Sequence, residues 1–241
     1  MDHLWLFITL ALLAEILGTV GGFGSSLFFV PIAGYFLDFQ SVLGITALFH
    51  VSSNLTKITF FRKGVDKKLL FSIGIPAVIF VIIGAAASKY FKSELLESIL
   101  AVFLILLSLF FLIFKSFSVK PTRANSIGGG VLSGLMAGLL GTGGVIRGMV
   151  LAAYNLKIEV FIATSAIIDL GIDLSRSVVY TLNGYVHTHD LYLIPILLVV
   201  SIAGTYIGKL ILSRISDNQF KTIVLVLVLV TGIVILFKQF E

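Results

Sequence analysis

The sequence contains no cysteine, only four prolines and few charged residues, which make up 12% of its 241 positions. The absence of cysteine excludes disulfide bonds and thiolate metal sites. The scarcity of charge excludes an ordinary water-soluble domain, in which about a quarter of the residues are charged and about half are apolar. Here 58% are hydrophobic, and the mean hydropathy is +1.12. Several apolar runs reach the roughly 20 residues that cross a hydrocarbon layer, so the sequence predicts an all-α, multi-pass integral membrane protein.

Long runs of like charge are also missing, although the formal net charge is +5. The basic residues form short clusters between apolar runs, a pattern that sets orientation in a bilayer and does not indicate a nucleic-acid partner. Residues 1–5 lack the basic start of a cleaved signal peptide, and Glu15 interrupts the apolar run that follows, so we expect this segment to be retained. No Walker A pattern and no nucleophile–base pair stands out, so we expect neither an enzyme nor a cofactor.

The apolar segments fall into two similar series. They lie at about 4–20, 25–37, 41–61, 69–88 and 95–114, and then at 126–140, 144–154, 160–181, 190–208 and 219–237. At an offset of 119 positions, Gly22 matches Gly141, Gly24 matches Gly143, and Pro76 matches Pro195. This register predicts an internal duplication, with a first transmembrane repeat at 1–114, a polar linker at 115–125 and a second repeat at 126–241. Duplicated halves are common in transporter folds.

Each series is broken near its start by a glycine cluster, and the break allows two topologies. If it only bends one spanning helix, the two repeats are parallel; if it is the tip of a hairpin, each repeat has a re-entrant hairpin plus three spanning helices, and the repeats are inverted. The pieces after the breaks, 25–37 and 144–154, are too short to cross alone. In the hairpin topology every loop Lys and Arg except Lys89, Lys92 and Lys238 is cytoplasmic, which favours inverted repeats with both termini outside.

Polar residues recur in register within the third segment of each repeat. His50, Asn54 and Lys57 share one helical face, and Asp169, Asp173 and Arg176 follow at the same offset of 119. Charged groups at mid-bilayer cost roughly 2.5–3.5 kcal/mol each on insertion scales, so we expect these side chains to face the interior and line a transport or coupling path. The structural alternative pairs an aspartate with Arg176 and lets Lys57 extend its ammonium group to the membrane surface.

The glycine clusters themselves predict an anion site. They leave backbone N–H groups free at the positive end of the following half-helix, and hydroxyl and guanidinium groups lie beside them. The predicted substrate-binding residues are Gly22, Phe23, Gly24, Ser25, Ser26, Gly141, Thr142, Gly143, Gly144 and Arg147. Close helix packing is the alternative for the glycines that precede each break, Gly18 and Gly22, and Gly130, Gly134 and Gly138. His187, His189 and Asp190 have a metal-like spacing, but Asp or Thr at a helix start is more often a cap, so no metal site is expected.

The residues Gly22-Phe-Gly24-Ser-Ser-Leu-Phe-Phe-Val-Pro31 resemble the first glycine motif of the sulfite exporter TauE/SafE family, roughly G-x-G-G-G-x-x-x-V-P. The second glycine cluster, the length and the linker also match, so the resemblance covers nearly the whole chain. It implies transport of a sulfur oxyanion or organosulfonate across a bacterial or archaeal plasma membrane. Ser25 and Ser26 stand where the family motif has glycines, and Val150 replaces the second proline.

Residues and resemblance together predict a secondary transporter, an exporter of a small anion such as sulfite. It would work by alternating access of one repeat against the other, with a proton as a coupling ion carried by His50 or the aspartates. A passive anion channel on the same scaffold and a membrane-embedded enzyme are the alternatives. The expected partners are the small anion, the coupling proton and the lipid bilayer.

Overall fold

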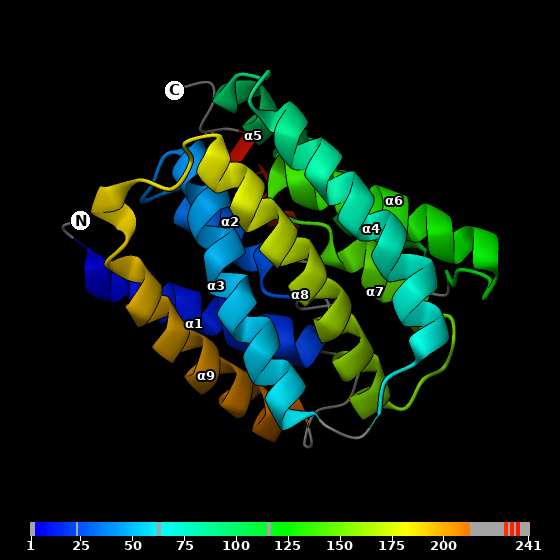
Figure 1. Ribbon diagram of the computed structural model, residues 1–241. Coiled ribbons are helices and arrows are strands. Elements are labelled where there is room, and N and C mark those ends of the chain that lie inside the picture. The colour runs from blue at the N-terminus through cyan, green and yellow to red at the C-terminus, as the bar shows by residue number, and fades with distance from the viewer. Residues whose placement is uncertain are drawn as a thin grey trace.

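The computed structural model describes residues 3–22, 24–61, 64–114 and 117–212, together with 229, 230, 232, 233, 235 and 236. Over these residues the chain is helical, without strands (Figure 1). The predicted segments are confirmed as helices within a few residues, except for 219–237, most of which lies outside the described residues. The helices are α1 (Leu4–Gly21), α2 (Ser26–Ala33), α3 (Phe39–Phe60), α4 (Lys67–Ser88), α5 (Ser93–Ile113), α6 (Arg123–Leu140), α7 (Gly144–Ala152), α8 (Ile158–Leu182), the 3₁₀ turn η1 (Thr188–Asp190) and α9 (Leu193–Leu212).

The second glycine break is the tip of an antiparallel hairpin. Gly141 ends α6 in the left-handed conformation, with φ of 74°, which glycine adopts without strain. The chain then turns back, so that Gly143 lies against the backbone of Ser133 and Val150 lies against Gly129. Because contacts move toward the start of α6 as α7 advances, the two helices run in opposite directions. With nine residues, α7 is only about 14 Å long.

The first break has the same geometry. Gly22 ends α1 with φ of 69°, and Gly18 lies directly against the backbone of Ser25. Further along, the ring of Phe29 on α2 packs at 5.9 Å from that of Phe7 on α1. The glycine at position 18 therefore allows the hairpin to close, because a Cβ there would overlap the returning chain.

Glycines on α6 also allow close packing with α4, as the small-residue spacing indicated. A Cβ added at any of three positions one turn apart would overlap the facing α4 backbone. The positions are Gly130, Gly134 and Gly138, which face the carbonyl groups of Ile73, Ala77 and Val81.

The long polar helices α3 and α8 pack against each other at the centre. In Figure 1 both run between α1 and α9 on one side and α4 and α6 on the other. Among the described helices, α1, α4, α5 and α9 are long and apolar enough to cross a membrane. The 22 and 25 residues of α3 and α8 are long enough, but these helices carry the polar residues of the site.

Loops gather at two opposite ends of the bundle (Figure 1). At one end Ser41 Oγ lies 2.8 Å from His187 Nδ1, joining the α2–α3 and α8–α9 connections. At the other end the Asp66 amide donates to Thr164 Oγ1 at 3.0 Å, and Lys209 donates to the Phe60 carbonyl at 3.0 Å. The described cations in the loops and at the helix ends are divided unequally between the two ends of the bundle. Lys89 and Lys92 lie at the first end. Those at the second end are Lys67, Lys68, Lys120, Arg123, Lys157 and Lys209.

Candidate functional site

Both hairpin tips, α3 and α8 surround a small polar cavity near the centre of the bundle. Its volume is about 20 Å³, which is space for a single water-sized molecule. The structure thus brings together most residues that the sequence singled out. The polar and glycine residues that line it are Gly24, Ser25, Ser26, His50, Ser53, Asn54, Lys57, Gly141, Gly143, Gly144, Arg147, Asp169, Asp173 and Arg176.

Arg147, in the first turn of α7, is held by α8. Its two terminal nitrogens contact the two carboxylate oxygens of Asp169, and its Nε donates to Ser165 Oγ at 3.2 Å. The Arg147 side chain is only 2% exposed, and that of Asp169 is 16% exposed, so the guanidinium of this bidentate pair is the more deeply buried partner. The charge that the sequence assigned to an anion is therefore matched by a carboxylate in this conformation.

Arg176 connects α8 to the tip of the second hairpin. Its Nε donates to Asp173 Oδ1 at 2.7 Å, and its Nη1 donates to the carbonyls of Gly141 and Ala137, at 2.8 and 3.3 Å. Those carbonyls end α6, where a cation also interacts favourably with the helix dipole. The second carboxylate oxygen of Asp173 accepts from Asn54 Nδ2 on α3 at 2.7 Å. One of the predicted structural pairs, Asp173 with Arg176, is confirmed.

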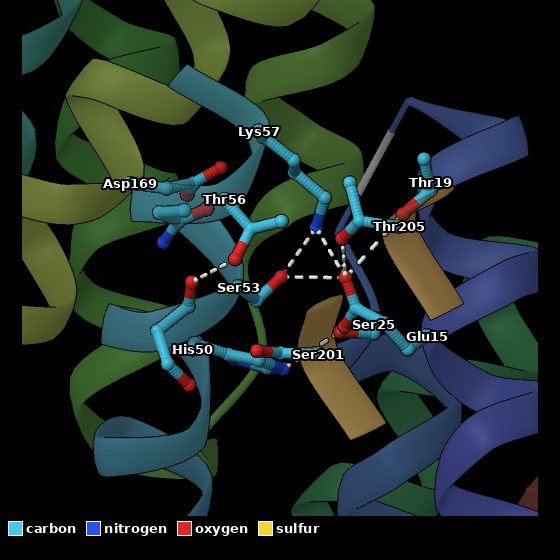
Figure 2. A network of polar contacts seen from close by, with 12 residues as sticks. Glu15, Thr19, Ser25, His50, Ser53, Thr56, Lys57, Asp169, Ser201 and Thr205 are labelled. Carbon is cyan, nitrogen blue, oxygen red and sulfur yellow. Dashed lines mark hydrogen bonds and ion pairs between the residues drawn. The ribbon is translucent and has the colours of Figure 1, made fainter. Parts of the chain in front are cut away.

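Lys57 does not extend to the membrane surface, because its ammonium group is buried and paired. Its Nζ lies 2.9 Å from Glu15 Oε1 on α1, and also donates to Ser53 Oγ at 2.7 Å. Hydroxyl groups from α1, the first hairpin tip, α3 and α9 converge on the same carboxylate (Figure 2). The donors are Thr19 at 3.3 Å, Ser25 at 2.5 Å, Ser53 at 2.6 Å and Thr205 at 3.0 Å.

Glu15 is the functional residue that sequence reasoning missed. It is fully buried, and five donors surround it. The available signal was a carboxylate in the middle of an apolar run, which was used only to argue against a signal peptide. The position 119 residues later is Gly134, so the repeat pattern that revealed the other charges gave no hint of this one.

The charges in the cavity wall are balanced once Glu15, which lies directly behind the wall, is included. Three buried cations, Lys57, Arg147 and Arg176, are paired with three carboxylates, Glu15, Asp169 and Asp173. His50 lies between two of these pairs and contacts Ser25 through Nε2 at 2.9 Å and Arg176 through Nδ1 at 3.2 Å. Since an arginine only donates hydrogen bonds, His50 accepts at Nδ1 and carries its proton at Nε2.

A second small cavity adjoins the first at the tip of α1. It also measures about 20 Å³ and is lined by Gly18, Thr19, Gly22, Gly24, Lys57, Ile162, Ser165, Ala166 and Asp169. Lys57 and Asp169 border both cavities. These two charged side chains therefore stand between the two spaces.

Not every predicted binding residue faces the main cavity. Gly22 borders the second cavity only, and Thr142 is buried without lining either. Phe23 lies outside the described residues. Neither α2 nor α7 has a side-chain cap at its first turn, although the Phe28 amide of α2 donates to the Ser25 carbonyl at 3.1 Å.

His187, His189 and Asp190 lie at the end of the bundle that carries Lys89 and Lys92, away from the cavity. Within the described ranges their ligand atoms come within 4.8 Å of one another, and Asp190 Oδ2 is buried without a hydrogen-bond partner. Ligand atoms around a tetrahedral zinc ion, at about 2.0–2.1 Å from it, are about 3.4 Å apart, so this group would have to contract to hold one.

Comparison with known proteins bears on the whole chain. A family model described as "Sulfite exporter TauE/SafE" matches residues 7–235. The chain belongs to the sulfite exporter TauE/SafE family. Apart from the first three residues of α1, the described helices, both hairpins and the central cavity fall within the matched range. No curated protein and no solved structure matches the chain. A TauE/SafE protein is a membrane transporter, so the paired charges at mid-bundle belong to a transporter of this family.

Proposed function

We propose that this TauE/SafE protein is a secondary transporter that exports a small anion, a sulfur oxyanion such as sulfite or an organosulfonate, across a prokaryotic plasma membrane. The observation that carries the proposal is the central cavity. It is bordered by two uncapped half-helix starts and by three buried cations. Half-helix starts supply oriented N–H groups, and Arg, Lys and Ser supply charge-assisted and neutral donors for anionic oxygens.

The proposed transporter consists of two inverted repeats. Helices α1 and α6 both have 18 residues, and their bounds differ by 119 positions at each end. Asn54 and Asp173, also 119 apart, hydrogen-bond directly at 2.7 Å. Equivalent residues meet in this way only close to a two-fold axis. Helix packing supports the same two-fold relation. Helix α1 packs on α9, and its counterpart α6 packs on α4, which is the counterpart of α9.

The basic end of the bundle, which carries Lys67, Lys157 and Lys209, is then cytoplasmic by the positive-inside rule. The second hairpin enters from this cytoplasmic side and the first from the opposite side, and their tips meet α3 and α8 near mid-membrane. Motion of one repeat against the other opens the cavity to each side in turn. Such motion is required, because a cavity of about 20 Å³ is too small for sulfite.

Charge balance favours a coupled transporter over the passive channel. Three cations and three carboxylates lie in or directly behind the cavity wall, so a bound anion would leave a net negative charge in a buried site. An uncompensated charge at mid-bilayer is costly. Uptake of one proton by a carboxylate, for each negative charge on the anion, restores neutrality and frees a cation to bind the anion. Anion and proton then cross together, and net direction follows their combined gradients.

Uptake of radiolabelled sulfite into proteoliposomes tests the proposal. Purified protein in liposomes that contain unlabelled sulfite should exchange it for the labelled form, with saturation and with competition by a sulfonate. Arg147→Met should abolish the exchange, whereas protein-free liposomes measure leakage through the lipid. Saturable exchange that is unaffected by Arg147→Met would overturn the site, and no exchange of sulfite or sulfonate would overturn the function.

A further inference from the structure

A continuous chain of hydrogen bonds joins two of the buried ion pairs. Arg176, already paired with Asp173, contacts His50 Nδ1 at 3.2 Å, and His50 Nε2 contacts Ser25 Oγ at 2.9 Å. Ser25 Oγ contacts Glu15 Oε2 at 2.5 Å, and Glu15 pairs with Lys57. The chain therefore runs from α8 through α3 and the first hairpin tip to α1.

Donor and acceptor roles fix the direction of this chain. Arg176 can only donate, so Nδ1 of His50 accepts and Nε2 carries the proton. The Ser25 hydroxyl accepts from His50 and donates to the Glu15 carboxylate, which has no proton to give. Every bond in the chain points toward Glu15.

We propose that Glu15 is the carboxylate that binds the transported proton, and that His50 and Ser25 deliver it from the cavity. This inference rests on the proposed anion–proton transport. An anion in the cavity attracts Arg176 away from His50, and Nδ1 becomes free to accept a proton from cavity water. His50 then passes its Nε2 proton to Ser25 Oγ as Ser25 passes its own proton to Glu15 Oε2. One proton enters at His50, one arrives on Glu15, and both relay residues end neutral.

Hydrogen-bond chemistry distinguishes Glu15 from the two buried aspartates. Asp169 and Asp173 are held largely by Arg147 and Arg176, which can only donate, so a proton on either aspartate would displace a donor. The hydroxyl at Asp169, Ser165 Oγ at 3.4 Å, already accepts from Arg147. Four hydroxyl groups surround Glu15, and a hydroxyl can either donate or accept. A neutral Glu15 can therefore donate to the hydroxyl oxygen of Ser53 or Thr205.

The charged surroundings of Glu15 also fit this role. From α3 it faces Lys57 directly and His50 through Ser25; Thr19 on α1 and Thr205 on α9 are uncharged. The next charges, Arg147, Asp169, Asp173 and Arg176, form balanced pairs. Protonation of Glu15 therefore releases one cation, Lys57. Because Lys57 borders both cavities, its freed ammonium group can bind the anion.

Two readouts in proteoliposomes test the relay. The first is exchange of labelled for unlabelled sulfite at equal pH on both sides, which needs anion binding but no net proton movement. The second is sulfite accumulation driven by a pH gradient. Glu15→Gln, which mimics the neutral acid, should lose accumulation while exchange persists, and Ser25→Ala, which interrupts the relay with Glu15 intact, should lose accumulation. Thr205→Val is the matched control, because it removes one hydroxyl from Glu15 outside the relay; its accumulation should remain much closer to that of the wild type.

Difference infrared spectroscopy gives a readout that does not depend on transport. Sulfite added to wild-type protein should produce the C=O band of a protonated carboxylic acid, and Glu15→Gln should remove that band. Accumulation by Ser25→Ala equal to that of Thr205→Val, or a sulfite-induced band that survives Glu15→Gln, would overturn the relay. If Glu15→Gln does not fold, Ser25→Ala decides. A wild-type protein with no exchange would contradict the proposed function itself.

Discussion

Replacing Asp169 by Asn should make sulfite bind more tightly, because Asp169 and the anion compete for Arg147. In the structure both terminal nitrogens of Arg147 are occupied by this carboxylate. The isosteric Asn removes the negative charge and changes the balance of the cavity wall from zero to one positive charge. Two unit charges 4 Å apart interact by about 4 kcal/mol at an effective dielectric constant of 20. Since water screens the freed guanidinium, we expect a smaller gain, about 10- to 100-fold in Kd, or about 1.4–2.8 kcal/mol.

Isothermal titration of detergent-solubilised protein with sulfite measures this change. The same variant should be less stable, by about 3–5 kcal/mol, because it leaves a buried cation without its partner. The double variant Arg147→Met with Asp169→Asn restores neutrality and serves as the control; it should lose the gain in affinity. Folded Asp169→Asn protein with unchanged or weaker sulfite binding would refute the view that the anion takes the place of a carboxylate.

Two further substitutions test the fold. Gly134→Ala should destabilise the protein by about 1–3 kcal/mol in thermal unfolding, because the added Cβ would overlap the Ala77 carbonyl on α4. Gly128 has open space around it, so Gly128→Ala should be neutral or should stabilise the protein by up to about 1 kcal/mol. Asp38→Ala should cost about 1 kcal/mol at neutral pH, because Asp38 caps α3 through Ser41. Partial burial raises the pKa of Asp38, but hydrogen bonds from Ser41 and the nearby His187 outweigh it, so the folded pKa lies below the ordinary 3.8. A carboxyl group with a depressed pKa stabilises the fold above its unfolded pKa, and this contribution is lost as the pH falls through its folded pKa. The stability advantage of the wild type over Asp38→Ala should therefore shrink below about pH 4. A difference in stability that does not change with pH would contradict this.

Much of the fold could be predicted because the bilayer restricts the choices. Apolar runs of spanning length and glycine clusters located the helices and both breaks. The short length of the pieces after each break, together with the asymmetry of the loop cations, favoured hairpins over bends, and the contacts of Gly18 and Gly143 with the preceding helices confirm the hairpins. The close helix packing predicted for Gly130, Gly134 and Gly138 is also confirmed. Gly18 was grouped with them, but it lies against the returning chain at Ser25 and allows the first hairpin to close.

The pairing of charges could not be predicted, because it depends on which helices meet. Sequence periodicity placed Asp169 and Asp173 on one face of α8 but could not show that Arg147 from α7 takes the first and leaves Arg176 to the second. The alternative in which Lys57 reaches the membrane surface was wrong, because the sequence did not show that Glu15 on α1 would lie beside its ammonium group. That pair forms only in the folded bundle, where α1 and α3 both pack on α9.

The most direct test of an electroneutral anion–proton transporter compares two driving forces on sulfite flux in proteoliposomes. One set carries a pH gradient with the membrane potential held at zero by potassium and valinomycin; the other carries a potassium diffusion potential at equal pH. The account predicts that the pH gradient drives sulfite accumulation and that the potential alone does not. Accumulation that follows the potential and ignores the pH gradient would contradict it and indicate an anion channel.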